Sequence, residues 1–334
     1  MKTIQKISLF LLLAVLLNAC KSKDAVSPYS VLLSKPPYTA ITDSINSYPK
    51  NEELYFRRAV LLNTNSQPEP ALSDFLKAWS LKKHEKFALG AGNILLDKKP
   101  DSAIRFISDA LKEFPESILL KLALAKSNNA RGKTDVALQL CDEILKVNPQ
   151  QVDVLKMKAE LVDKKGDNNE ALRILETAYQ ITPYDIDLNY ELAYKYAESK
   201  NARVLLLCDS LAKADTLNNH AEPEYYKGIY YSNTGDKQKA LSSFNIAIQK
   251  DYYYLNAHIE KGRVLLDTKK YNEALKAFQL PNVISPDFPD AWYWMGRCQE
   301  AMGNKEEAKL NYQKAYGLDN TFTEAKDAAD KLGK

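Results

Sequence analysis

The chain has 334 residues, of which 45% are hydrophobic and 27% are charged, and its formal net charge is +3. Its 11 glycines and 14 prolines are too few for a collagen-like chain, a disordered chain or a fold with many tight turns. The near-neutral, interspersed charge also lacks the basic surface that nucleic-acid binding requires.

The first 20 residues have the pattern of an export signal. Lys2 and Lys6 precede the apolar stretch ISLFLLLAVLL. Small residues follow this stretch and lead to Cys20. Leu17-Asn18-Ala19-Cys20 resembles the lipobox of bacterial lipoproteins. The resemblance implies that residues 1–19 are a signal peptide and that Cys20 carries several acyl chains, which together give stable membrane anchoring. The alternative is an ordinary cleaved signal that has a cysteine at its junction by chance.

Removal of residues 1–19 takes away two lysines and no acidic residue, so the net charge falls from +3 to +1. Residues 20–37 contain three prolines and several serines, which predicts a flexible tether after the lipid-bearing cysteine. Residues 38–50 predict a short capping helix. No later stretch is apolar over a length sufficient to span a bilayer.

The rest of the chain is periodic. Glycines recur every 34 residues at Gly228, Gly262 and Gly296. Two further sets keep the same step, namely the alanines Ala240, Ala274 and Ala308, and the aromatic residues Phe244, Phe278 and Tyr312. Such self-similarity indicates an array of repeated helical hairpins.

Gly296 lies inside a predicted helix, where glycine costs about 1 kcal/mol relative to alanine. We expect the repeated small residues, including Gly296 and Ala308, to let two antiparallel helices approach closely. The dispersion attraction between such closely packed helices would offset the cost of the glycine.

The period, the order of small and aromatic residues and the closing prolines resemble the tetratricopeptide repeat. The resemblance implies an all-α fold, a right-handed α-solenoid of about eight helix-turn-helix repeats over residues 51–320, with residues 321–334 as a carboxyl-terminal capping helix. Two places depart from the pattern. The fifth repeat lacks the central glycine, and Pro281 predicts that the second helix of the seventh repeat stops early or kinks at Leu280.

In this family the first helix of each repeat lines a concave surface. We predict that its exposed stripe lies three residues before, one after and four after the small residue. The partner-binding candidates on this stripe are Tyr190, Tyr194, Tyr225, Ile229, Ile259, Arg263, Tyr293 and Arg297. Tyrosine and arginine favour protein contact surfaces, and the two arginines would pair with acidic groups. The alternative for individual tyrosines is packing between neighbouring repeats.

No catalytic motif is found, and no metal site or cofactor site is predicted. The three histidines, His84, His220 and His258, form no known catalytic or metal-binding pattern. Cys141, Cys208 and Cys298 lie in apolar helical contexts without a C-x-x-C motif, so we interpret them as small core residues. We therefore expect the protein not to be an enzyme and to have no small-molecule substrate.

The leading hypothesis is a lipid-anchored scaffold or adaptor of the bacterial envelope that binds a segment of another envelope protein. Lys21 follows the lipid-bearing cysteine, which favours the outer membrane and a location facing the periplasm. The alternative is a glycan-binding, nutrient-capture lipoprotein built on similar helical repeats. The 3 tryptophans and the regular spacing leave little room for the aromatic platforms and long loops of that class.

Overall fold

The computed structural model describes residues 28–217 and 219–333, in which every regular element is an α-helix. The predicted signal peptide and Cys20 lie outside these residues. The chain forms two compact units, one ending at Leu140 and the other beginning at Cys141, so the boundary falls within a helix, α9.

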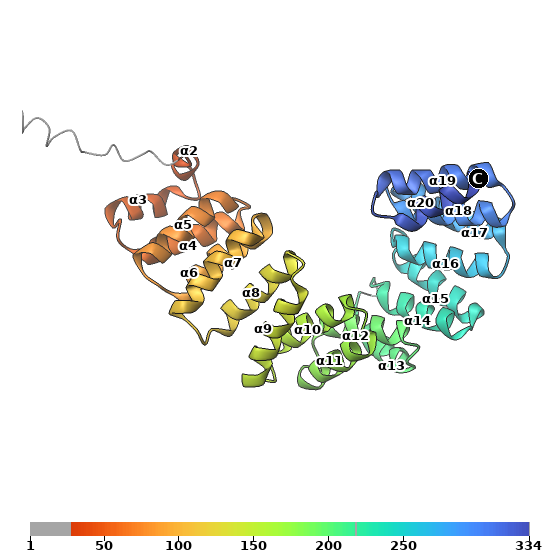
Figure 1. Cartoon of the computed structure of the whole chain (residues 1–334), viewed down its shortest axis with the longest axis horizontal. Coiled ribbons are helices and arrows are strands. Elements are labelled where there is room, and N and C mark those ends of the chain that lie inside the picture. The colour runs from red at the N-terminus through yellow and green to blue at the C-terminus, as the bar shows by residue number, and fades with distance from the viewer. Residues whose placement is uncertain (1–27, 218, 334) are drawn as a thin grey trace, which may run out of the picture. The chain divides into compact units, whose positions relative to one another are not determined.

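Eight pairs of helices follow one another along the described residues (Figure 1). Their first helices are α4 (Glu52–Thr64), α6 (Glu85–Lys98), α8 (Ile118–Ala130), α10 (Val152–Lys164), α12 (Ile186–Glu198), α14 (Glu222–Thr234), α16 (Leu255–Asp267) and α18 (Pro289–Ala301). Their second helices are α5 (Pro68–Leu81), α7 (Pro100–Glu113), α9 (Thr134–Val147), α11 (Asn168–Ile181), α13 (Arg203–Ala214), α15 (Lys237–Lys250), α17 (Tyr271–Ile284) and α19 (Lys305–Leu318). The predicted all-α fold of repeated hairpins is confirmed.

Two short helices precede the first repeat, α2 (Ser30–Leu33) and α3 (Thr39–Ser47). Helix α3 lies within the segment predicted as a cap. Leu33 is buried in the core of the first repeat. The prediction of a flexible tether as far as residue 37 is therefore wrong for its last part, because an apolar side chain there is anchored by packing.

A buried ion pair lies inside the first repeat. Arg58 of α4 donates two hydrogen bonds to the carboxylate of Asp74 in α5, with N···O distances of 2.6 and 2.8 Å. A third hydrogen bond, 3.1 Å long, runs from Arg58 to the hydroxyl of Thr42 in α3. A two-point guanidinium–carboxylate contact fixes geometry more strictly than a single bond. The same side chain thus joins both helices of the repeat to α3.

Each periodic glycine makes room for an aromatic ring on the second helix of its own repeat. A Cβ added at Gly262 would lie only 2.3 Å from Cε1 of Phe278, and one at Gly296 would lie 2.7 Å from Cδ1 of Tyr312. Gly228 has the same relation to Phe244, at 2.4 Å. At Gly296 such a Cβ would also lie 3.2 Å from the carbonyl oxygen of Ala308, so the predicted approach of the two helices is present there, but the group that fills the space beside all three glycines is a fully buried ring.

In the fourth and fifth repeats, different residue types fill the space between the two helices. Their first helices carry Ala159 and Ala193, while the second helices carry Leu175 and Cys208 where the later repeats have an aromatic residue. All four side chains are buried in one core cluster. Burial raises the pKa of the Cys208 thiol to about 12, and that of Cys141 to about 11, which keeps both thiols protonated at neutral pH.

The turn inside each hairpin often needs a residue in the left-handed region. Gly132, Gly166, Gly235 and Gly303 adopt φ values of 71°, 89°, 90° and 87°. In other repeats the same conformation is taken by Ser66, Lys200 and Lys269, with φ between 57° and 59°. A side chain makes this conformation less favourable, so these three repeats store backbone strain at the turn.

Pro281 does not end the second helix of the seventh repeat. Helix α17 continues to Ile284, and the N–H of Ser285 donates to the carbonyl oxygen of Pro281. The prediction of an early stop or kink at Leu280 is wrong in respect of the stop. Proline has no backbone N–H, so one helical hydrogen bond is lost at Pro281, which lies in the last turn of α17. The proline ring is buried in the core.

After the last repeat, α20 (Thr323–Leu332) packs against α19 and buries Ala325 and Ala329. Its other side chains are mostly charged or polar, and they face away from the core. In the second compact unit, the first helices of successive repeats also contact one another, α12 with α14, α14 with α16 and α16 with α18. This side-by-side arrangement places their exposed stripes on one face.

Candidate functional site

A cavity of about 600 Å³ lies along the first helices of repeats five to eight. We call it the groove. Its walls are formed by Tyr194, Glu198, Tyr225, Ile229, Ser232, Asn233, Glu260, Arg263, Leu266, Asp267, Lys269, Tyr271, Trp294, Arg297 and Ala301. All of these residues belong to the second compact unit.

Five of the eight residues predicted on the exposed stripe line the groove, namely Tyr194, Tyr225, Ile229, Arg263 and Arg297. The three others do not. They share one position, three residues before the small residue of the first helix, and they are Tyr190, Ile259 and Tyr293.

These three side chains point toward seams rather than into the groove. Ile259 is only 5% exposed and belongs to the core of the seventh repeat. The ring of Tyr293 packs 4.9 Å from that of Phe322, just before α20. Tyr190 lies in a smaller cavity of about 370 Å³, where its ring is 6.1 Å from that of His220.

Two positions outside the predicted stripe also line the groove. One is five residues after the small residue and holds Glu198, Asn233, Asp267 and Ala301. The other is two residues before it and holds Glu260 and Trp294. Both positions neighbour the well-predicted position one after the small residue, because helical residues three or four apart share a face. A stripe centred on the position one after the small residue would have included both.

The repeat-eight end of the groove is cationic and aromatic. The guanidinium of Arg263 lies 4.7 Å from the ring centroid of Trp294, and that of Arg297 lies 5.9 Å from it. Arg263 also forms a 2.6 Å ion pair with Glu260. Among the described residues, no carboxylate lies within 4.0 Å of Arg297, whose nearest polar partner is the Tyr293 hydroxyl at 3.3 Å.

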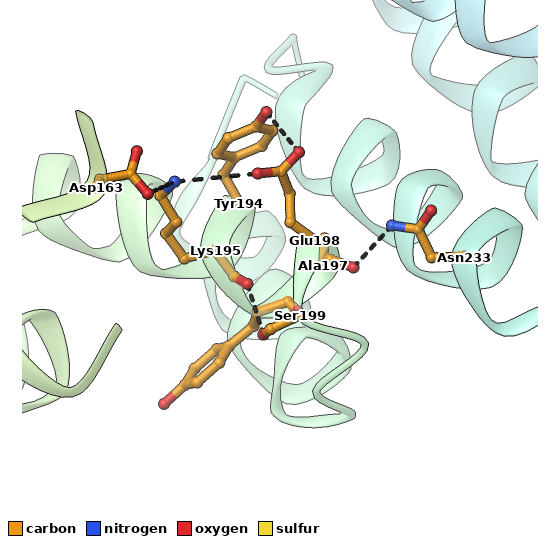
Figure 2. A network of polar contacts seen from close by, with 8 residues as sticks. Asp163, Tyr194, Lys195, Ala197, Glu198, Ser199 and Asn233 are labelled. Carbon is orange, nitrogen blue, oxygen red and sulfur yellow. Dashed lines mark hydrogen bonds and ion pairs between the residues drawn. The ribbon is translucent and has the colours of Figure 1, made fainter. Parts of the chain in front are cut away.

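The repeat-five end has the opposite charge. The Tyr194 hydroxyl donates to Glu198 at 2.8 Å, and Lys195 lies 2.7 Å from Asp163 but 4.0 Å from Glu198 (Figure 2). One ammonium therefore serves two carboxylates. Asn233 of α14 donates to the carbonyl oxygen of Ala197 at 3.2 Å, which ties the neighbouring first helix to this network.

The groove floor holds a partly buried carboxyl group and a buried phenol. Burial raises the pKa of Glu260 above its ordinary value, and the nearby Arg263 opposes this shift. Burial also raises the pKa of Tyr225, and the charge of Glu260 adds to the effect. Tyr225 is only 9% exposed. The chemistry available here is recognition by hydrogen bonds and paired charges.

Family comparisons agree with this architecture. The family model described as "Tetratricopeptide repeat" matches residues 95–161, and a second model of that description matches residues 289–322. These two segments of the chain are therefore tetratricopeptide repeats.

Two curated proteins show local similarity to this repeat array. Tetratricopeptide repeat protein 14 of Mus musculus is 30% identical over 116 residues, which cover 32% of this chain. The match spans only 15% of the mouse protein's length. An uncharacterized protein of Methanocaldococcus jannaschii is 40% identical over 58 residues, covering 17% of this chain and 67% of that protein.

Solved structures share the fold of the repeat array at low sequence identity. A tetratricopeptide repeat protein from Parabacteroides merdae aligns with a TM-score of 0.65 at 17% identity, covering 74% of this chain and 98% of its own. The hetero-tetramer Cut9–Hcn1 of APC/C aligns with a TM-score of 0.52 at 15% identity, covering 87% of this chain and 57% of the matched chain.

The three histidines are dispersed over the repeat array in structural roles. His84 caps α6 by accepting a hydrogen bond from the N–H of Lys86 at Nδ1. His258 is buried, and its Nε2 lies 2.9 Å from the carbonyl oxygen of Tyr252. In residues 28–217 and 219–333, no three His, Cys, Asp or Glu side chains group so that they could hold a metal ion.

The helices of this described part are also too short, or too polar, to cross a lipid bilayer.

Proposed function

We propose that the protein is a lipid-tethered adaptor of the bacterial envelope whose groove binds a segment of another envelope protein. The supporting observation is a cavity that collects Tyr194, Arg263, Trp294 and Arg297 from the first helices of several repeats. Aromatic residues and arginine are the side chains that contribute most to binding energy at protein interfaces. The protein would act by binding, as a scaffold that assembles or regulates a complex, and not by catalysis.

The rigidity of the groove supports this proposal. Its side chains project from helices whose opposite faces are fixed in the repeat cores, so few of them must be ordered when a partner arrives. An extended or helical peptide segment would contact several repeats at once. The arginines on repeats seven and eight would pair with acidic groups of that segment.

The membrane attachment rests on the sequence around Cys20. A diacylglycerol and an acyl group on this residue would hold the repeat array at the membrane, and Lys21 supports an outer-membrane location facing the periplasm. Replacement Cys20→Ser tests this point. We expect the variant to leave the membrane fraction and appear in the soluble fraction, whereas its retention with membranes would refute the lipid anchor.

The groove is tested by photocrosslinking in living cells. A benzoylphenylalanine at Ser232, in the groove, should capture a defined partner. The matched control places it at Ser242, an exposed residue of the second helix α15. Equal crosslinking from both positions would contradict binding in the groove.

A charge-reversal pair completes the test. Arg263→Glu/Arg297→Glu should abolish the crosslink at Ser232, because acidic groups of the partner would be repelled. Arg105→Glu/Arg173→Glu reverses the same number of charges at exposed positions on second helices and should leave it unchanged. If neither variant matters and oligosaccharides instead raise the melting temperature, the glycan-binding alternative replaces the adaptor proposal.

A further inference from the structure

The two ends of the groove present charged groups of opposite sign. At the repeat-five end, Lys195 is shared by Asp163 and Glu198, and it lies closer to Asp163 by more than 1 Å (Figure 2). This group of three has a net charge of −1. The carboxylate of Glu198 therefore faces the groove with a tyrosine hydroxyl at 2.8 Å and only a share of the Lys195 ammonium, which lies 4.0 Å away, to stabilise it.

At the repeat-eight end the balance is reversed. Glu260 compensates Arg263 at 2.6 Å. Arg297 has no such partner among the described residues and lies over the ring of Trp294. The side of the groove formed by α18 thus presents, beside an aromatic surface, a guanidinium with no described carboxylate within 4.0 Å, although the more distant charge of Glu300 acts on it.

Between the two ends, Tyr225 supplies an unused hydrogen-bonding group. The residue is 9% exposed and lines the groove, so its small exposed part opens there. Within residues 28–217 and 219–333 its hydroxyl makes no hydrogen bond, and its oxygen is not fully buried, so an occupant of the groove can reach it. A polar atom of an occupant would provide the missing partner.

We propose that the segment bound in the groove is zwitterionic, with a basic and an acidic side chain in a fixed order. The lysine or arginine of the segment binds Glu198 and the Tyr194 ring, a polar group meets the Tyr225 hydroxyl, and an aspartate or glutamate binds Arg297. This inference rests on the proposed function and specifies the partner's chemistry.

A purely acidic segment fits this groove less well. It would bring negative charge next to Glu198 and Glu260, and like charges brought together at an interface reduce affinity and exclude partners. A purely basic segment meets the same obstacle at Arg297. Opposite charges at the two ends also define the direction in which the segment lies, because reversing it would place both of its charges beside like charges.

The test is a selection from an mRNA-displayed library of random dodecapeptides on the full chain, immobilised through its carboxyl end. We expect enriched peptides to share one basic and one acidic position at a constant separation and in one order. For such a peptide, Glu198→Lys should weaken binding about ten-fold, which is about 1.4 kcal/mol. Replacing the basic residue of the peptide by glutamate should restore most of the affinity toward this variant.

The control variant is Glu113→Lys, which reverses an exposed charge at the end of the second helix α7 and should leave the affinity unchanged. Enriched peptides that are only acidic, with tighter binding to Glu198→Lys, would overturn the zwitterionic pattern and leave the proposed function standing. Identical enrichment by wild type and by Arg263→Glu/Arg297→Glu, or no enrichment at all, would overturn the groove as a peptide site and the inference with it.

Discussion

The fourth and the seventh repeats solve one packing problem in two ways. In the seventh, Gly262 lets the ring of Phe278 fill the space between the helices, and the ring is fully buried. In the fourth, Ala159 faces a core that contains Leu175 at the equivalent position. In each hairpin the paired side chains of the two helices together fill the space between them. A glycine, which is unfavourable in a helix, is therefore tolerated where its partner is large.

The largest expected effect comes from removing the large member of each pair. Phe278→Ala should reduce the free energy of unfolding by about 3–5 kcal/mol, since the ring is fully buried and Gly262 cannot refill the cavity. Leu175→Ala should cost less, roughly 2–3 kcal/mol, because Ala159 keeps its methyl group. Urea denaturation measures both. Equal losses would show that the two repeats pack in the same manner.

The second test adds volume to the small member. Gly262→Ala places a Cβ 2.3 Å from Phe278, which should cost about 1–3 kcal/mol despite the better helix propensity of alanine. Phe278→Leu in the same chain should recover part of the loss. The reciprocal change Ala159→Gly should cost about 1 kcal/mol, because it lowers helix propensity without a ring to fill the space. A stabilising Gly262→Ala would disprove the pairing of sizes.

A third, smaller difference between repeats lies in their turns. The fourth repeat has Gly166 at φ 89°, whereas the fifth has Lys200 at φ 59°. Lys200→Gly should raise the free energy of unfolding by roughly 0.5–1 kcal/mol, because the left-handed strain of about 1–2 kcal/mol is relieved at the entropic cost of a glycine. Thermal unfolding checks this. The control Glu160→Gly, at an exposed position inside the regular helix α10, should destabilise instead.

The smallest expected effect concerns pH. Burial raises the pKa of Glu260 in the folded protein above its ordinary value of 4.5, so over the interval just above 4.5 the folded state retains a proton that the unfolded state has lost. The free energy of unfolding must therefore fall as pH rises through that interval. Glu260→Gln should remove this slope. A carboxyl titration by NMR that gives a pKa below 4.5 for Glu260 would refute it.

Much of the architecture could be predicted because it is encoded locally. The step between Gly228, Gly262 and Gly296 sets the repeat. The prediction paired Gly296 with Ala308, and the structure shows that Tyr312 is the side chain it makes room for. The effect of Pro281 on its helix was harder to predict, because a proline in the last turn of a helix removes fewer hydrogen bonds than a proline in the middle. Whether residues 30–33 are ordered could not be predicted, because it depends on the packing of Leu33 in the core of the first repeat.

The groove was predicted only in part. Arg263 and Arg297 were found because they occupy equivalent exposed positions on successive first helices. Glu198 and Trp294 lie outside the predicted stripe, because that stripe is centred too far toward the seam between repeats. Ile259 was assigned to the surface, although its position faces the core of the repeat. The rotation of each first helix about its axis decides whether a side chain at such a position faces the groove or the core.

The sequence by itself determined the repeat and its length, because these depend on spacing within about one hairpin. Only the tertiary structure decided which flank of each first helix faces the groove and which charges lie at its two ends. Both depend on distances between side chains of different repeats, such as Lys195 to Asp163, and a linear pattern does not contain those distances.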